Sequence, residues 1–168
     1  MVPIVLTGLV IGFVSASQLW PSPSRAEGMA RLFVEFCLPH HRGENMLPKA
    51  LAEFVAESSD LAGTRWIDNE TASYLSLRAS KCSIDTVHPF ALSHEDAEDL
   101  LNLVATIVEK EFPDLPFDPK AAMGPETLSK GWLEGPLQSP ERWGVFFWAF
   151  PDWGDSSGSV LMLTSPSG

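Results

Sequence analysis

The sequence has little of what most functional motifs are built from. It contains two cysteines, and its 11 basic residues face 22 acidic ones, which gives a net charge of −11. It also lacks a Gly-rich phosphate loop, a G-x-S-x-G nucleophile motif, an H-E-x-x-H zinc motif and any C-x-x-C pair. No motif therefore assigns a catalytic residue or a cofactor, and a non-enzymatic role is the simpler interpretation.

The shortage of basic residues excludes one class of partner. Nucleic-acid binding requires clustered Lys and Arg to neutralise phosphates, and attraction to anionic membrane surfaces has the same requirement. With twice as many acidic as basic residues, the chain is expected to bind neither. A basic protein or a cationic ligand stays compatible with this charge, which also favours solubility.

Long apolar runs are scarce too, and the exception lies at the N-terminus. Residues 2–16 are largely apolar and are followed at once by serines, prolines and charges, which is the layout of an export signal. Small residues stand at the required positions for cleavage after Ala16 or after Ala26. We therefore expect residues 1–26 to form a signal peptide and residues 27–168 a single domain, periplasmic or secreted.

A second interpretation of this run stays open. No Lys or Arg precedes it, although a signal peptide usually begins with positive charge, so the run could instead be retained as a membrane anchor. It is short for that role, because a membrane-spanning helix needs about 20 apolar residues. No later segment is long enough, so we expect no membrane association once the signal is removed.

The two cysteines fall in different predicted elements. Helical periodicity in residues 28–38 places Cys37 on an apolar face, whereas Cys82 lies in a β-branched, alternating segment typical of a strand. In an oxidising compartment two cysteines usually pair, and a helix packed on a sheet would bring these two together. We predict a Cys37–Cys82 disulfide that contributes about 4 kcal/mol in the chain-entropy model.

An alternative hypothesis assigns metal-handling or thiol redox chemistry to the segment FCLPHH. Thiolate and imidazole suit copper(I) or zinc, and the segment holds three candidate ligands, Cys37, His40 and His41. Against this hypothesis, Pro39 is expected to break the helix between the thiol and the imidazoles. The simpler interpretation is a polar histidine pair at a helix end, favoured by the helix dipole, with no metal bound.

Periodicity predicts the remaining elements. Residues 45–57 and 93–112 are amphipathic at helical spacing, and Ser93 caps the longer helix. Two strands are expected over residues 64–68 and 72–87, because both are rich in β-branched and aromatic residues and a polar turn separates them.

The segment 113–142 is rich in Pro and Gly and is expected to be a loop. A loop of this length in a small domain is uncommon and is often functional. Two strong strands follow, in the sequences RWGVFFWAF and SVLMLTS, and the turn residues between them predict a C-terminal hairpin. The chain therefore ends in ordered structure after the loop.

The first strand of that hairpin is apolar on both faces. Helices can cover one face, so the loop, a dimer mate or a ligand must cover the other. We therefore take the aromatic residues of this region as candidate binding residues, with core packing as the simpler alternative. They are Trp132, Trp143, Phe146, Trp148, Phe150 and Trp153.

Together these elements predict an α+β fold. We expect two N-terminal helices, a long central helix and an antiparallel or mixed sheet of about four strands that ends in the C-terminal β-hairpin, with one disulfide. The function expected is that of a small exported binding or interaction protein without enzymatic activity. Its partner would be a protein or a small ligand, or a second copy bound through the hairpin.

Overall fold

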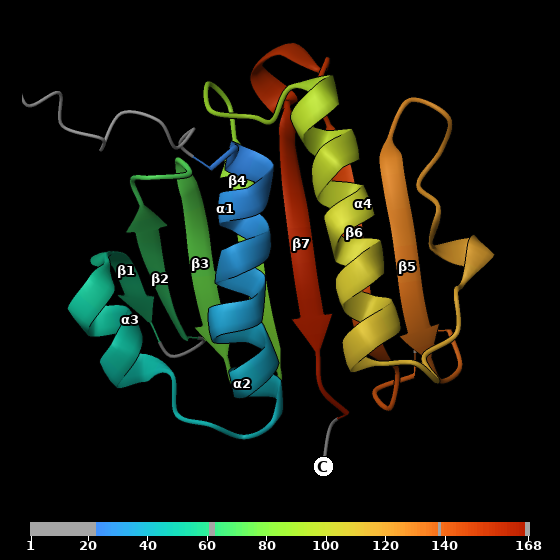
Figure 1. Cartoon of the computed structure of the whole chain (residues 1–168), viewed down its shortest axis with the longest axis horizontal. Coiled ribbons are helices and arrows are strands. Elements are labelled where there is room, and N and C mark those ends of the chain that lie inside the picture. The colour runs from blue at the N-terminus through green and yellow to red at the C-terminus, as the bar shows by residue number, and fades with distance from the viewer. Residues whose placement is uncertain (1–22, 61–62, 138, 167–168) are drawn as a thin grey trace, which may run out of the picture.

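The computed structural model describes residues 23–60, 63–137 and 139–166, which form a two-layered α+β fold (Figure 1). A seven-stranded antiparallel sheet makes one layer, and helices lie across one of its faces. The predicted α+β class is confirmed, but the sheet has seven strands instead of about four. Most of the predicted signal peptide, Ala16 included, lies outside the described residues.

The helical layer has three segments. They are α1 (Arg25–Leu32) continued by the π-helical turn η2 (Phe33–Cys37) and α2 (Leu38–His41), then α3 (Leu47–Glu53), then α4 (His94–Glu111). The strands are β1 (Val55–Asp60), β2 (Gly63–Asp68), β3 (Ser73–Arg78), β4 (Lys81–Val87), β5 (Leu128–Glu134), β6 (Trp143–Phe150) and β7 (Gly158–Thr164). Two short 3₁₀ turns are η3 (Pro119–Ala121) and η4 (Gly154–Ser156). The strand order β1-β2-β3-β4-β7-β6-β5 makes β1 and β5 the edges.

The first helical segment runs without a break to His41, so the break expected at Pro39 is wrong. The helix widens into a π turn, in which the N–H of Leu38 bonds to the carbonyl of Phe33. Pro39 then falls in the first turn of α2, a position that tolerates proline. The predicted apolar face of this segment is fully buried and consists of Met29, Leu32, Phe33, Phe36 and Cys37.

The start of α1 is held by several contacts. Ser24 and Glu27 form a capping box, with the Glu27 N–H 3.1 Å from Ser24 Oγ and the Ser24 N–H 2.7 Å from the Glu27 carboxylate. Arg25 donates to three backbone carbonyls outside the helix, those of Thr71, Phe90 and Ala91. Ala26 is fully buried. The second predicted cleavage point, after Ala26, therefore falls inside a packed helix.

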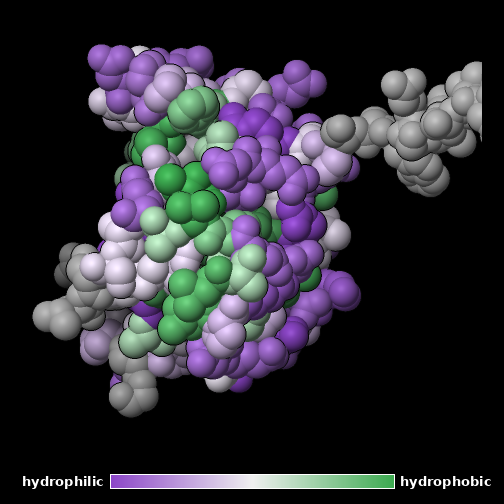
Figure 2. Space-filling model, turned by 90° about the vertical axis from the view of Figure 1, so that its left-hand side faces the viewer, coloured by the Kyte–Doolittle hydropathy of each residue, from purple (hydrophilic) through white to green (hydrophobic). Residues whose placement is uncertain are grey.

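The helix predicted over 45–57 is half helix and half strand. α3 ends at Glu53, Phe54 is extended, and the chain continues as β1, which pairs with β2. The sheet offers backbone hydrogen bonds that outweigh a weak helical preference. Three apolar side chains of this stretch stay exposed, namely Leu47, Leu51 and Val55. Figure 2, which faces the side of the molecule that carries α3 and β1, shows a band of hydrophobic side chains there.

Three strands replace the two predicted between residues 64 and 87. The second predicted strand is split into β3 and β4 by a turn at Ala79 and Ser80, so that Arg78 pairs with Lys81. No Gly, Pro or Asn marks this turn, and the β-type pattern runs through it. A continuous pattern without turn residues therefore hid the hairpin.

The long central helix is confirmed as α4. Ser93 caps it, because its Oγ lies 3.1 Å from the N–H of Asp96. The buried stripe of α4 consists of Ala97, Leu100, Val104 and Val108, and α4 packs beside α1 over the sheet (Figure 1). In the part of the chain that the structure describes, no helix combines the length and the apolar character needed to cross a membrane.

The two edge strands of the sheet differ in whether another segment pairs with their outer side. β5 lies within the predicted loop 113–142, and a short extended segment covers its outer edge, with Asp118 N–H to Gly131 O at 2.9 Å and Leu133 N–H to Pro116 O at 3.0 Å. At the opposite edge, β1 has no strand beyond it among the described residues. Among the described residues, β1 is therefore the edge strand that no extended segment covers.

The predicted C-terminal hairpin is confirmed by the antiparallel pairing of β6 with β7. It lies inside the sheet, because β7 also pairs with β4 and β6 also pairs with β5. The backbone groups of the hairpin thus have partners on both sides. A second molecule that met the hairpin would contact its side chains.

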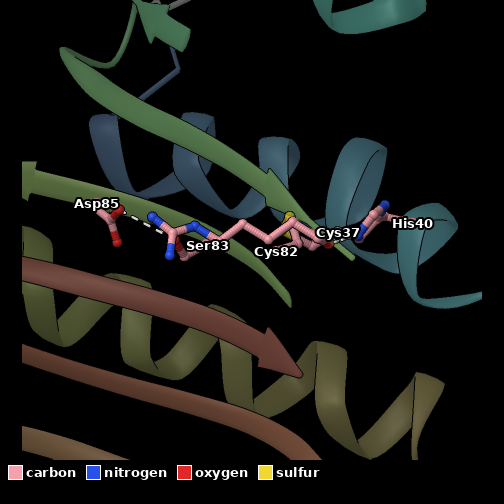
Figure 3. Close-up of a disulfide and its surroundings, with 6 residues drawn as sticks. Cys37, His40, Cys82, Ser83 and Asp85 are labelled. Atoms are coloured by element: carbon pink, nitrogen blue, oxygen red, sulfur yellow. Dashed lines mark hydrogen bonds between the residues drawn. A yellow bond between two sulfur atoms is a disulfide. The ribbon is translucent and has the colours of Figure 1, made fainter. Parts of the chain in front are cut away.

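The predicted disulfide is confirmed. Cys37 and Cys82 are joined across 45 residues with their Cα atoms 5.2 Å apart, and both are buried. Figure 3 shows the bond linking the first helical segment to β4. It fastens the helical layer to the middle strand of the sheet.

Candidate binding face

Strand alternation divides the sheet side chains between two faces. The face under the helices buries large apolar side chains, among them Trp66, Ile84 and Phe147. The opposite face, which we call the open face, is covered by none of the helices in the described ranges (Figure 1). Register places one row of its residues across five strands, Arg65, Ser76, Ser83, Met162 and Phe146, and a second row across four, Tyr74, Asp85, Val160 and Trp148.

The open face is hollowed over its middle strands. The hollow has a volume of about 650 Å³ and extends from β2 and β3 to β6 and the turn before β7. This volume lies in the range of small-molecule sites. Its two ends differ in chemistry, because one is aromatic and the other cationic.

The aromatic end comes from β6 and the turn that follows. The rings of Trp148 and Phe150 meet edge-on with centroids 4.7 Å apart, and Phe150 lies 4.6 Å from Trp153. Trp153 is 47% exposed, so this cluster is accessible from solvent. Such a cluster offers flat apolar surface to a ligand.

The cationic end comes from β2, β3 and β4. The Arg65 guanidinium lies 3.7 Å from the centre of the Tyr74 ring and has a carboxylate neighbour, since its Nε is 3.4 Å from Glu57 Oε2. Arg78 and Lys81 also line the hollow, and within the described ranges neither forms an ion pair. Three cations therefore gather at this end.

One carboxylate, that of Asp85, lies in the floor of the hollow. Burial raises the pKa of Asp85, and the Ser83 hydroxyl together with Arg65, Lys81 and Arg78 opposes that rise. Ser83 Oγ donates to the Asp85 carboxylate at 3.2 Å, the contact drawn in Figure 3. Asp85 is therefore easier to protonate than an ordinary aspartate.

The structure separates the six aromatic residues proposed for binding. Trp132 is buried on the covered side. Trp143 faces the helices, where its ring stacks on His41 with centroids 5.4 Å apart. The positions of Trp132 and Trp143 on the covered side favour core packing over ligand binding. The other four lie on the open face or beside it in the turn, Phe146, Trp148, Phe150 and Trp153.

The residues of the alternative metal or redox hypothesis have other partners. Cys37 is bonded to Cys82, so it has no thiolate to offer. His40 Nε2 lies 2.7 Å from the Arg78 carbonyl, and His41 Nδ1 lies 2.8 Å from Ser165 Oγ. Burial, with help from its two basic neighbours, lowers the pKa of His41. Among the residues that the structure describes, no three His, Cys, Asp or Glu side chains form a metal-binding group.

Sequence reasoning missed the polar half of the hollow. Arg65, Arg78, Lys81 and Asp85 alternate with buried residues along β2, β3 and β4. That alternation would have placed all four on one face, had three strands been predicted there instead of two. The missed turn between β3 and β4 therefore also concealed the cations.

Comparison of the chain with models of known protein families, with curated proteins and with solved structures found no match. The role of the open face must therefore be argued from its own geometry.

Proposed function

We propose that this protein is an exported, non-enzymatic binding protein that holds a ligand on the open face of its sheet. The observation that carries the proposal is the hollow of about 650 Å³ with an aromatic cluster at one end. Export is supported by the apolar N-terminal run and by the disulfide, because disulfides persist in oxidising compartments.

The open-face aromatics are not needed for the core. Residues such as Phe147 and Leu161, which point to the covered face from the same hairpin, are fully buried under the helices. Trp148 and Phe150 point the other way and stay half exposed. Clustered apolar surface that is left in contact with water marks interaction sites more often than isolated apolar side chains do.

Tryptophan emission provides the test. A panel of soluble small ligands is titrated into the wild-type protein, into Trp148→Ala and into the matched control Val34→Ala, which removes an exposed apolar side chain from the helical layer. We expect any ligand of this face to lose about tenfold or more in affinity with Trp148→Ala and to keep its affinity with Val34→Ala. Binding that Trp148→Ala leaves intact would exclude the open face.

Intact mass of the exported protein under non-reducing conditions tests the export part of the proposal. The contacts of Ser24 and Arg25 favour cleavage after Ala16, because cleavage after Ala26 would remove both residues. We expect the mass of residues 17–168 less two hydrogens, and no alkylation before reduction. A chain that begins at residue 27, or one that retains the apolar run, would contradict this expectation.

A further inference from the structure

The charge of the open face is opposite to that of the whole chain. The protein has twice as many acidic as basic residues, yet the hollow is lined by three cations, Arg65, Arg78 and Lys81, and by one carboxylate, Asp85. A net positive hollow on an acidic protein attracts anions locally and is surrounded by surface that repels them. The charge expected of a ligand is therefore negative, whereas net charge alone suggested a cationic one.

Two of these cations lie opposite each other on paired strands. Arg78 and Lys81 stand directly opposite each other where β3 and β4 begin to pair, and like charges in that relation destabilise a sheet. Neither has an ion-pair partner among the described residues. The Arg78 carbonyl is held by His40, which fixes the backbone that carries the guanidinium. An anion between the two side chains would relieve their repulsion.

The single carboxylate offsets only part of this charge, because Arg65, Lys81 and Arg78 all act on Asp85, the one carboxylate among the lining residues. Asp85 lies four residues along β4 from Lys81 and accepts its hydrogen bond from Ser83. Arg65, the third cation, already has Glu57 and the Tyr74 ring as neighbours. Of the three cations, Arg78 and Lys81 are the two for which the described residues provide no ion pair, so they are the ones left to meet an anion.

The distance between the two ends sets the length of a ligand. Asp85 pairs with Val160 and Val160 with Trp148, so Trp148 is two strands away from β4. Two strand spacings and four residues along a strand place Trp148 about 16 Å from Lys81. A ligand that met both ends would be elongated, with its charge at one end and its apolar part at the other.

We propose that the hollow binds a free, monomeric anionic amphiphile, whose carboxylate lies between Arg78 and Lys81 and whose apolar tail lies against Trp148 and Phe150. Guanidinium and ammonium groups donate charge-assisted hydrogen bonds to a carboxylate, and the aromatic rings shield the tail from water. This inference rests on the proposed binding function and adds the chemical class of the ligand.

Three probes with the same ten-carbon tail test the charge: decanoate, 1-decanol and decylammonium. Each is titrated below its aggregation concentration, with calorimetry and tryptophan emission as readouts. We expect decanoate to bind the wild-type protein about tenfold or more tightly than decanol, and decylammonium to bind weakest. The decanoate affinity should also fall as salt is raised.

Variants separate the two parts of the site. The double variant Arg78→Gln, Lys81→Gln should lose the preference for decanoate over decanol, whereas Trp148→Ala should weaken both. The matched control is Arg31→Gln, Lys110→Gln, which removes two exposed cations from the helical layer and should change neither affinity. The Gln substitutions alter exposed side chains except at Lys81, which is half-buried, and melting temperatures equal to that of the wild type confirm that both variants fold.

The outcomes distinguish failure of the ligand class from failure of the site. If decanoate and decanol bind equally and Trp148→Ala weakens both, the anionic class is wrong and the open face still binds. If decanoate binds but Trp148→Ala and the double Gln variant leave it unchanged, the site is elsewhere and both proposals fail. If none of the three probes binds, both proposals fail as well. Binding only to decanoate-containing vesicles, and not to free decanoate, would overturn the monomeric ligand.

Discussion

The same strands form the covered face and the open face of the sheet, because successive side chains along a strand point to opposite faces. Under the helices most side chains are apolar and almost fully buried, with a few buried hydroxyls such as those of Thr86 and Ser159. Across the same backbone the open face carries cations, hydroxyls, a carboxylate and half-exposed aromatics. The difference shows that β6, which is apolar on both sides, buries one side under the helices and leaves the other partly exposed. Substitutions on the two faces should therefore have different consequences.

The largest expected effect compares adjacent residues of β6. Phe147→Ala should cost about 3 to 5 kcal/mol of unfolding free energy, because it leaves a cavity beneath the helices. Trp148→Ala should cost about 1 kcal/mol, because its ring is partly exposed and contacts Phe150 but lies on the face away from the helices. Urea denaturation of both variants measures the contrast. Similar losses would mean that the open face contributes to folding as the covered face does.

The next effect concerns the bond that joins the helical layer to the sheet. Replacing Cys37 and Cys82 together by Ala should cost about 4 kcal/mol, the loop-closure value for the 45 residues enclosed. Reduction of the wild-type protein should reproduce the loss, whereas the reductant should not change the double variant. Binding at the open face should survive wherever the variant stays folded, since the bond lies on the covered side.

A smaller effect comes from Asp85 on the open face. Its folded pKa is raised above the ordinary 3.8 because burial disfavours the charge. The folded state then holds its proton to higher pH than the unfolded state does, so stability falls as pH rises through that interval. Asp85→Asn should be more stable than the wild type at pH 7 and should lose this advantage below about pH 3.8. Denaturation at both pH values checks the sign.

The smallest effect has the opposite sign and belongs to the covered side. The pKa of His41 is lowered from 6.5, mainly by burial. The unfolded state therefore binds the proton first as pH falls, and stability declines below about pH 6.5. His41→Phe should make this decline shallower while keeping a ring against Trp143. The exposed His88→Gln is the control, and an equally shallow decline in that variant would count against His41.

The features predicted from the sequence are those that depend on local residue patterns, together with the disulfide, because the chain has just two cysteines that could pair. The buried stripe of α4, the apolar face around Cys37, the disulfide and the C-terminal hairpin were all predicted correctly. Local residue patterns did not predict which segments, distant in the sequence, pair with one another as strands. Val55 forms a strand because β2 lies beside it, and β5 lies in a segment whose Pro and Gly residues predicted a loop.

The candidate site was predictable only in part, for the same reason. The aromatic half follows from alternation within β6, which one strand suffices to define. The cationic half combines side chains from three strands, and its recognition requires the turn at Ala79 and Ser80, where no Gly, Pro or Asn stands. Alternation separates Trp143 from Phe146, Trp148 and Phe150, but it does not show which of the two faces the helices cover. Trp132 lies in β5, within the segment predicted as a loop, so no face was defined for it.

The two edges of the sheet differ in how far they are covered, and this difference affects how copies of this chain could pair through their edge strands. Pro116 and its neighbours cover part of the β5 edge, so among the described residues β1 is the edge more open to a further strand. Two molecules that joined through β1 would use the same surface on each and would be related by a two-fold axis, which completes the assembly at a dimer with one continuous sheet. Growth into an open filament by strand addition would need two different open edges, and in the part of the chain that the structure describes one edge is partly covered.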